Sequence, residues 1–284
     1  MSIFEAIILG IVEGLTEYLP VSSTGHLIIA RYLLQLNDGD AQKAFEICIQ
    51  GGAILAVLGI YFQRVKGITA DTFSWLRNRK SHPELPAGMR LLINMIIGFL
   101  PAAVIGLALS KYIKGYLFNA PVVTTMWALG GLVILLYVRA REKSGKGFSG
   151  KKLEELSYLG ALKVGFMQCI AMCPGVSRSL MTMLGGLCAG LSVSAAVEFS
   201  FLLGLITLGA ATAHDAYEYG QAMITDIGWP AIIAGTITAW LSAIIAVKWM
   251  VGYLNKHSLD IFGWYRIGAA AIMLVLILFA GLSF

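Results

Sequence analysis

The sequence predicts an all-α polytopic membrane protein, on the evidence of its composition, its recurring apolar runs and its distribution of positive charge. Of its 284 residues, 58% are hydrophobic and 13% are charged, whereas a soluble domain carries about 25% charged residues. Apolar runs of about 20 residues recur along the chain, and each can cross a hydrocarbon core of roughly 30 Å. A soluble fold is therefore excluded, and we expect a single membrane domain over residues 1–284.

The first element is predicted to be a re-entrant helical hairpin over residues 3–36. This stretch is apolar at both ends, but its centre holds Glu13, Glu17, Pro20 and the polar run Ser-Ser-Thr-Gly-His at 22–26. Broken backbone at membrane depth survives only where protein buries it or where it lines a polar cavity. We therefore expect a helix, a polar break and a second helix that returns to the same side.

Three transmembrane helices follow this hairpin, and the same order of elements is then repeated. The apolar runs place the first three spans at 44–62, 91–109 and 120–138. A second re-entrant hairpin is predicted at 158–192, where the apolar sequence is interrupted by Gln168, Pro174, Gly175, Ser177, Arg178 and Ser179. The remaining three spans lie at 195–213, 229–250 and 262–282.

Lysine and arginine predict the orientation of these elements. The connections 63–90 and 139–163 hold six and seven of the 21 basic residues, whereas the connection 214–228 holds none. Because positively charged connections remain in the cytoplasm, both termini and the mouth of the first hairpin are expected outside. The second hairpin then opens toward the cytoplasm.

The two halves of the chain resemble each other and predict an inverted-topology repeat. Repeat 1 covers about 1–138 and repeat 2 about 157–284, and Gly-Ile-Val-Glu at 10–13 matches Gly-Phe-Met-Gln at 165–168. Each repeat contains a hairpin and an odd number of spans, so the second copy enters the membrane upside down. Folds of this kind place a site at the repeat interface near the midplane.

Charged side chains at this depth need a function or a partner, since a charge at the centre of a membrane helix costs about 2.5–3.5 kcal/mol or more. Glu13 and Glu17 are four residues apart, so both carboxylates share one helix face. Two like charges on one face must hold a cation, share a proton or meet an arginine. A structural ion pair with Arg178 is one interpretation, and a catalytic site is the other.

The polar centres of the two hairpins favour the catalytic interpretation. Ser23 opens the second arm of the first hairpin, and His26 follows it by three residues. A hydroxyl beside an imidazole and carboxylates is a nucleophile-and-base arrangement. In the second hairpin, Ser177 and Arg178 stand at a helix N-terminus, where free amides and a guanidinium fork suit phosphate oxygens. The combination predicts hydrolysis of a phosphoryl group.

At these residues the chain resembles the bacterial undecaprenyl-diphosphate phosphatase family, also called the bacitracin-resistance family, over nearly its whole length. The resemblance rests on Glu-Gly-Leu-Thr-Glu at 13–17, Leu-Pro-Val-Ser-Ser-Thr-Gly-His at 19–26 and Pro-Gly-Val-Ser-Arg-Ser-Leu-Met-Thr at 174–182. It implies hydrolysis of undecaprenyl diphosphate to undecaprenyl phosphate and inorganic phosphate, which recycles the lipid carrier for cell-wall peptidoglycan synthesis and gives bacitracin resistance. It also implies the bacterial cytoplasmic (inner) membrane, an active site between the hairpins that opens to the periplasm, and a divalent cation, Mg2+ or Ca2+.

The resemblance also implies roles for individual residues. Glu13 and Glu17 would bind the cation or act as acid and base, and Arg178 would hold the diphosphate. Ser23 is the candidate nucleophile, while His26 either activates it or attacks phosphorus itself, and water is the third candidate. The remaining substrate-binding candidates are Ser22, Thr24, Ser177, Ser179, Thr182, Glu46, Gln50 and Glu198. The expected partners are a polyprenyl diphosphate lipid and the bilayer, with no nucleic acid, and a homodimer is left open.

Two other functions compete with hydrolysis by this family: that of an unrelated phosphatase and that of a lipid transporter. A phosphatase of the type-2 phosphatidate phosphatase kind requires a histidine six residues after the arginine, and Leu184 stands at that position after Arg178. A lipid transporter or flippase is compatible with inverted repeats, because a repeat fold does not fix function. The phosphate chemistry around Ser23 and Arg178 favours the enzyme.

Overall fold

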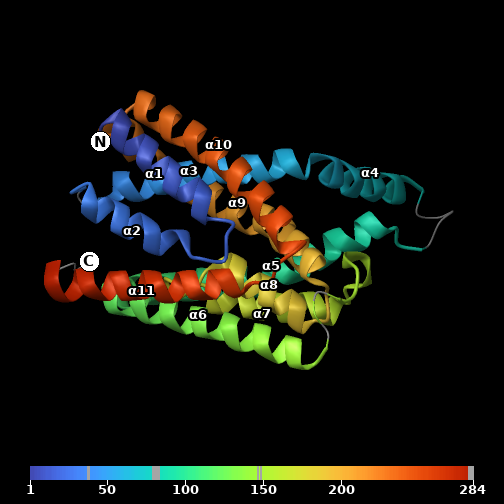
Figure 1. The fold of residues 1–284 in the computed structure, drawn as a ribbon. Helices are drawn as coiled ribbons and strands as arrows, with labels where there is room; N and C mark the ends of the chain where they lie inside the picture. Colours follow the sequence, from blue (N-terminus) through green and yellow to red (C-terminus); the bar gives the residue numbers. More distant parts are fainter. Residues whose placement is uncertain (37–38, 79–83, 146, 148, 281–284) are drawn as a thin grey trace.

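The computed structural model describes residues 1–36, 39–78, 84–145, 147 and 149–280, and every regular element in these ranges is a helix (Figure 1). In chain order the elements are α1 (Ile3–Thr16), α2 (Ser23–Leu33), α3 (Asp40–Ile60), α4 (Phe62–Asn78), α5 (Ala87–Tyr116), α6 (Ala120–Lys143), the 3-10 turn η1 (Leu153–Glu155), α7 (Tyr158–Ile170), α8 (Arg178–Cys188), α9 (Val193–Asp226), α10 (Trp229–Leu254) and α11 (Asp260–Ala280). Among the described helices, α3, α5, α6, α9, α10 and α11 are the six long and apolar enough to cross a membrane. The predicted six-span, all-helical membrane protein is therefore confirmed.

The predicted connections at the ends of two spans are wrong in part. Helix α5 continues to Tyr116 and α9 continues to Asp226, although 110–119 and 214–228 were expected to be connections. Polar residues lower the hydropathy of a window without stopping a helix, and α9 ends only before Gly228, whose φ is 83°. Residues 281–282 of the last predicted span, and Arg79, Lys80 and Lys146 of the charge count, lie outside the described residues.

Each predicted hairpin is a pair of short helices joined by a tight polar turn. Helix α1 is followed by a turn at 17–22 and then α2, and α7 is followed by a turn at 171–177 and then α8. Ser22 and Ser177 occupy the same place before the second helix, with φ of 71° and 79°. Positive φ is uncommon for a residue with a Cβ atom, so both turns adopt the same disfavoured conformation.

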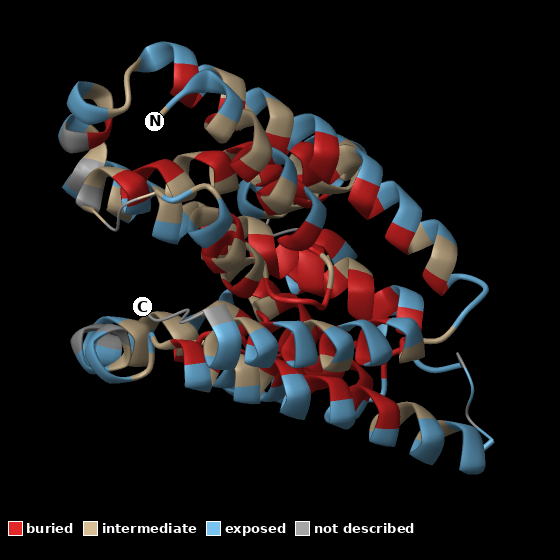
Figure 2. Ribbon diagram, turned by 60° about the vertical axis from the view of Figure 1, so that its left-hand side comes forward, coloured by how far each residue is buried: buried red, intermediate tan, exposed pale blue. Residues whose placement is uncertain are grey.

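The helices of the two halves interlock. Helix α1 packs against α10 and α7 packs against α5, while α3 packs against α9 and α6 against α11; Figure 1 shows α6 and α11 running side by side at one edge. The α1–α10 contact is close because Gly10 and Gly14 face it: a Cβ on Gly14 would lie 2.1 Å from the Ser242 hydroxyl. Buried residues follow these inner faces, and outer faces are exposed (Figure 2).

An ion-pair network joins elements at the α4 end of the molecule. Arg64 of α4 pairs with Glu198 of α9 at 2.9 Å and also with Glu154 of η1. The hydrogen bond that Arg64 donates to Glu154 holds the pKa of the Glu154 carboxyl below its usual range. The network ties the connection between α6 and α7 to both halves of the fold.

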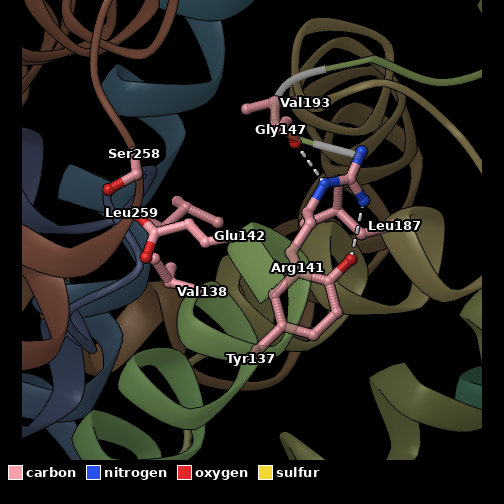
Figure 3. Close-up of a pocket in the computed structure, with 9 residues that line it drawn as sticks. All are labelled: Tyr137, Val138, Arg141, Glu142, Gly147, Leu187, Val193, Ser258 and Leu259. Atoms are coloured by element: carbon pink, nitrogen blue, oxygen red, sulfur yellow. Dashed lines mark hydrogen bonds between the residues drawn. The ribbon is translucent and has the colours of Figure 1, made fainter. Parts of the chain in front are cut away.

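A pocket lies at the C-terminal end of α6 (Figure 3). Its lining residues are Tyr137, Val138, Arg141, Glu142, Gly147, Leu187, Val193, Ser258 and Leu259. Arg141 donates to the Gly147 carbonyl and, at 2.9 Å, to the Tyr137 hydroxyl. Its guanidinium therefore holds the loop after α6 in place.

Candidate active site

Glu13, near the end of α1, and Glu17, in the turn that follows it, are both buried but have different surroundings. Glu13 is 1% exposed and Glu17 is 7% exposed. Glu17 lies in the turn after α1 and both of its carboxylate oxygens have partners. Within the described part of the chain, neither carboxylate oxygen of Glu13 has a hydrogen-bond partner.

Glu17 joins the two hairpins. The Ser23 hydroxyl donates to Glu17 Oε2 at 2.5 Å, and Arg178 Nη2 donates to Glu17 Oε1 at 3.2 Å. The structure thus brings together the predicted acid, nucleophile and phosphate-binding arginine, although Arg178 lies 161 residues from Glu17 in the chain. A carboxylate that accepts a short hydrogen bond from a hydroxyl can take its proton.

Arg178 is held from several sides. Its Nη1 donates to the Ser200 carbonyl at 3.2 Å, and its guanidinium carbon lies 5.2 Å from the centre of the Tyr18 ring. A cation over an aromatic face is stabilised by the ring quadrupole. Gly204 leaves room for the side chain, since a Cβ there would lie 2.5 Å from Arg178 Nη1.

The hydroxyls of the second hairpin form a buried hydrogen-bonded set. The Ser177 and Ser179 hydroxyls are 2.9 Å apart, and Ser179 also donates to the Leu19 carbonyl at 2.8 Å. The Thr182 and Ser200 hydroxyls are 2.6 Å apart. Ser177 additionally caps α8 by accepting from the Leu180 amide. These residues join the hairpin turns to one another and to α9.

His26 lies beside the cluster, and both of its ring nitrogens have partners other than Ser23. Its Nδ1 is 2.7 Å from the Ser22 carbonyl and its Nε2 is 2.6 Å from the Tyr265 hydroxyl. Because a carbonyl only accepts, Nδ1 carries the proton and Nε2 accepts from Tyr265. The ring also stacks on Tyr265 and contacts Trp127. Among the described residues, neither ring nitrogen of His26 is hydrogen-bonded to the Ser23 hydroxyl, so the predicted activation of Ser23 by His26 has no direct contact to support it here.

The remaining predicted substrate-binding residues are not hydrogen-bonded to Glu17, Ser23 or Arg178 among the described residues. Glu46 pairs with Arg31 at 3.1 Å, and Glu198 pairs with Arg64 at 2.9 Å. Gln50 accepts from the Thr212 hydroxyl at 3.4 Å. Ser22 is buried and does not cap α2 with its side chain, and Thr24 is half-buried in the first turn of α2.

Sequence reasoning missed residues of α11 that reach the site. Tyr265 contacts His26, and the adjacent Arg266 is 0% exposed and donates to the Pro20, Met126 and Gly175 carbonyls. Arg266 could have been identified from the sequence, because a single arginine in an apolar span carries the same free-energy cost of a buried charge as Arg178. Tyr265 gave no such signal.

The donor set at Glu13 suits a divalent cation. Mg2+ and Ca2+ take carboxylate oxygens as ligands, and the buried oxygens of Glu13 lack any protein partner among the described residues. Glu17 lies four residues further on. The residues present therefore fit the cation that the resemblance implies.

An all-helical membrane domain in which a buried carboxylate contacts a hydroxyl and a guanidinium fits the class of membrane-embedded hydrolases that handle phosphoryl groups. The family model for bacitracin resistance protein BacA matches residues 6–272, and the chain belongs to this family. Similar proteins named undecaprenyl-diphosphatase come from Methylococcus capsulatus (43% identical, covering 95% of this chain and 93% of the relative), Dechloromonas aromatica (42%, 96% and 93%) and Nitrosomonas europaea (42%, 96% and 94%). The chain is accordingly a multi-pass membrane hydrolase.

Proposed function

We propose that the protein hydrolyses undecaprenyl diphosphate to undecaprenyl phosphate and inorganic phosphate at the cluster formed by Glu17, Ser23 and Arg178. The observation that carries the proposal is the pair of contacts at Glu17, which accepts from Ser23 at 2.5 Å and from Arg178 at 3.2 Å. A proton acceptor, an oxygen nucleophile and a phosphate-binding cation are thereby in contact. Relatives about 40% identical over most of the chain carry the name of this activity.

The contacts assign a role to each side chain. Glu17 takes the proton of the Ser23 hydroxyl as its oxygen bonds to the terminal phosphorus, and the bridging P–O bond breaks to release the lipid monophosphate. Arg178 binds the oxygens on which negative charge accumulates, and such stabilisation is a large part of phosphoryl-transfer catalysis. Water then attacks the phosphorus of the phosphoserine, and the bond between the Ser23 oxygen and phosphorus breaks. The Ser23 oxygen takes back the proton held by Glu17, and the atoms of the water leave in inorganic phosphate. His26 holds the turn, because its Nδ1 bonds to the Ser22 carbonyl and its Nε2 bonds to the Tyr265 hydroxyl of α11.

Glu13 and Glu17 would hold the divalent cation. Such an ion would neutralise charge on the diphosphate. The orphan oxygens of Glu13 support this assignment.

We place the cluster within the membrane, between two re-entrant hairpins. Helices α1, α2, α7 and α8 have 14, 11, 13 and 11 residues, which at 1.5 Å per residue is about 16–21 Å. None of these lengths crosses a hydrocarbon core of about 30 Å. The reciprocal packing of α1 on α10 and α7 on α5 supports an inverted repeat. The positive-inside rule puts the basic connections in the cytoplasm, which leaves the mouth of the first hairpin on the periplasmic side of the inner membrane. The cluster then opens to the periplasm through that hairpin.

The experiment is phosphate release from a prenyl diphosphate by the purified protein in detergent, with Mg2+ or with EDTA. We expect release that requires the cation and is abolished in Glu17→Ala and Arg178→Ala. His214→Ala is the matched control, because His214 is exposed on α9 and, among the described residues, its ion-pair partner is Glu218, at 3.7 Å. A monodisperse wild-type protein that releases no phosphate in the presence of lipid would support the transport alternative instead.

A further inference from the structure

Arg266 of α11 reaches the turns of both hairpins. Its Nη1 donates to the Pro20 carbonyl at 3.3 Å, and its Nη2 donates to the Gly175 carbonyl at 2.8 Å and to the Met126 carbonyl at 2.9 Å. These acceptors belong to the first hairpin turn, the second hairpin turn and α6. We propose that Arg266 is a positioning residue that fixes the two turns relative to each other and so sets the geometry of the active site.

The two turns are held at equivalent points. Pro20 precedes Ser23 by three residues, and Gly175 precedes Arg178 by three residues. One guanidinium therefore fixes the backbone three residues before the proposed nucleophile and three residues before the phosphate-binding arginine. Its fork geometry lets a single side chain hold acceptors from separate segments.

Burying the charged Arg266 side chain in a membrane span costs free energy, which indicates that its contacts with the two turns serve the active site. The residue is fully buried within a candidate membrane span, and its hydrogen-bond partners among the described residues are carbonyls, with no carboxylate to neutralise it. An arginine at such depth is expensive and is usually functional. The neighbouring helix is shaped for it, since a Cβ on Gly130 would lie 2.3 Å from Arg266 Nη2.

Loss of this contact would affect the reaction more than substrate binding. The turns would still carry Ser23 and Arg178, but their separation would no longer be fixed. A misplacement of about 1 Å can cost about 100-fold in rate. This inference rests on the proposed active site, because it concerns the distance between the residues assigned there.

The test measures kcat, KM and thermal unfolding in detergent for wild type, Arg266→Gln and Arg266→Lys, on a prenyl diphosphate. For Arg266→Gln we expect kcat to fall about 10–100-fold with KM changed by less than about 3-fold, at a temperature well below its unfolding midpoint. Arg266→Lys keeps the charge and some donors, so its kcat should lie between those of Arg266→Gln and wild type.

Arg141 offers a matched control on the neighbouring helix. It too donates to loop carbonyls, those of Gly147 and Ser149, but it lies 15 residues beyond Met126 along α6, which is about 22 Å. Arg141→Gln should lower the unfolding midpoint and leave the kcat of the folded protein unchanged. Comparable loss of kcat in both variants would show a general packing effect and overturn the positioning role.

Other outcomes separate this inference from the proposed function. Wild-type kcat in Arg266→Gln, with Arg178→Ala inactive, would overturn the positioning role and leave the active site in place. An Arg266→Gln defect confined to KM or to the folded fraction would also overturn it. Absence of turnover in folded wild-type protein would instead remove the proposed function.

Discussion

Glu17 uses its two carboxylate oxygens for different partners, the Ser23 hydroxyl on one side and the Arg178 guanidinium on the other. Removing the negative charge therefore weakens two contacts that lie in different hairpins. Glu13 differs because its oxygens accept no hydrogen bond in the described residues. The two acidic residues of one motif thus have different surroundings, which fits the proposal that both hold the cation and that Glu17 also takes the Ser23 proton.

Glu17→Gln should reduce kcat by about 100–10,000-fold, the range typical of losing a general base. The amide keeps the shape of the side chain but cannot accept the Ser23 proton. Steady-state phosphate release in detergent measures the change. Glu5→Gln is the control on the same helix, because Gln preserves the capping box that Glu5 forms with Ser2; a loss of similar size in both variants would contradict the assignment.

Tyr265→Phe tests the contact between α11 and His26. The change keeps the ring that stacks on His26 and removes the hydroxyl that donates to Nε2 at 2.6 Å. We expect a loss of about 1 kcal/mol in the free energy of unfolding, the usual net value of a hydrogen bond. The effect should disappear in a His26→Phe background, as a double-mutant cycle requires for a direct interaction. Equal losses in both backgrounds would show that the hydroxyl acts elsewhere.

The site residues that could be predicted from sequence are those whose burial in a membrane is energetically unfavourable or whose place follows a helix break. Glu17 and Arg178 stand out because ionisable groups in apolar runs are expensive, and Ser23 stands out because it follows a helix-breaking proline. The partner of His26 could not be predicted, since Tyr265 lies 239 residues away and half-exposed tyrosines are common in membrane helices. Arg266 satisfied the same cost criterion as Arg178, and that criterion should have identified it.

At the scale of elements, small residues decide how closely α1 approaches α10. A Cβ on Gly14 would lie 2.1 Å from the Ser242 hydroxyl and 2.2 Å from the Ala239 carbonyl. Both neighbours belong to a helix that would have to move. The position of Glu17 at the end of α1 therefore depends on glycine at this contact.

Gly14→Ala should destabilise the protein by about 1–3 kcal/mol, the usual cost of overpacking, despite the gain of about 1 kcal/mol that alanine brings to an isolated helix. Thermal unfolding in detergent measures the difference. Gly59→Ala in α3 is the control, because nothing lies within 4 Å of a Cβ at Gly59, and it should be neutral or stabilising. Equal unfolding midpoints for the two variants would contradict the close contact.

The network around Arg64 predicts a pH dependence of stability. Because the pKa of Glu154 is lowered in the folded state, its contribution is present above the unfolded pKa and is lost as the pH falls through the lower, folded value. The carboxylate is 44% exposed, so we expect at most about 1 kcal/mol, the upper end for exposed pairs. Unfolding midpoints of wild type and Glu154→Gln should differ at neutral pH and converge in acid; a constant difference would contradict the ion pair.

The spans could be predicted from sequence more accurately than their ends. Apolar runs identify the buried length of a helix, but helical hydrogen bonding continues through exposed polar residues, as in α9 up to Asp226. The stop signal was present, since Gly228 adopts positive φ immediately before α10. The short hairpin helices were recognisable because polar turns interrupt them in both halves.

At the scale of the whole molecule, the pairing of helices follows a single rule. The first helix of each hairpin packs against the second span of the other half, α1 on α10 and α7 on α5. The first spans α3 and α9 pack on each other, and so do the last spans α6 and α11. Such reciprocity supports the proposed repeat of two equivalent halves, and the turns of the two hairpins meet where Glu17 contacts Arg178.

The distribution of basic residues, combined with the proposed inverted repeat, predicts which side of the membrane each end of the molecule occupies. In a variant whose other cysteines are replaced, Gln35→Cys and Tyr217→Cys should react with a membrane-impermeant maleimide in intact cells, since both lie at the end expected outside. Lys151→Cys and the native Cys188 should react only after permeabilisation, because both lie at the end that carries the basic connections. All four positions are exposed in the structure, so a difference in labelling reports sidedness rather than burial. Labelling of Cys188 in intact cells would place the mouth of the second hairpin outside and contradict the inverted orientation of the halves, whereas the expected pattern would leave the first hairpin as the periplasmic route to the cluster.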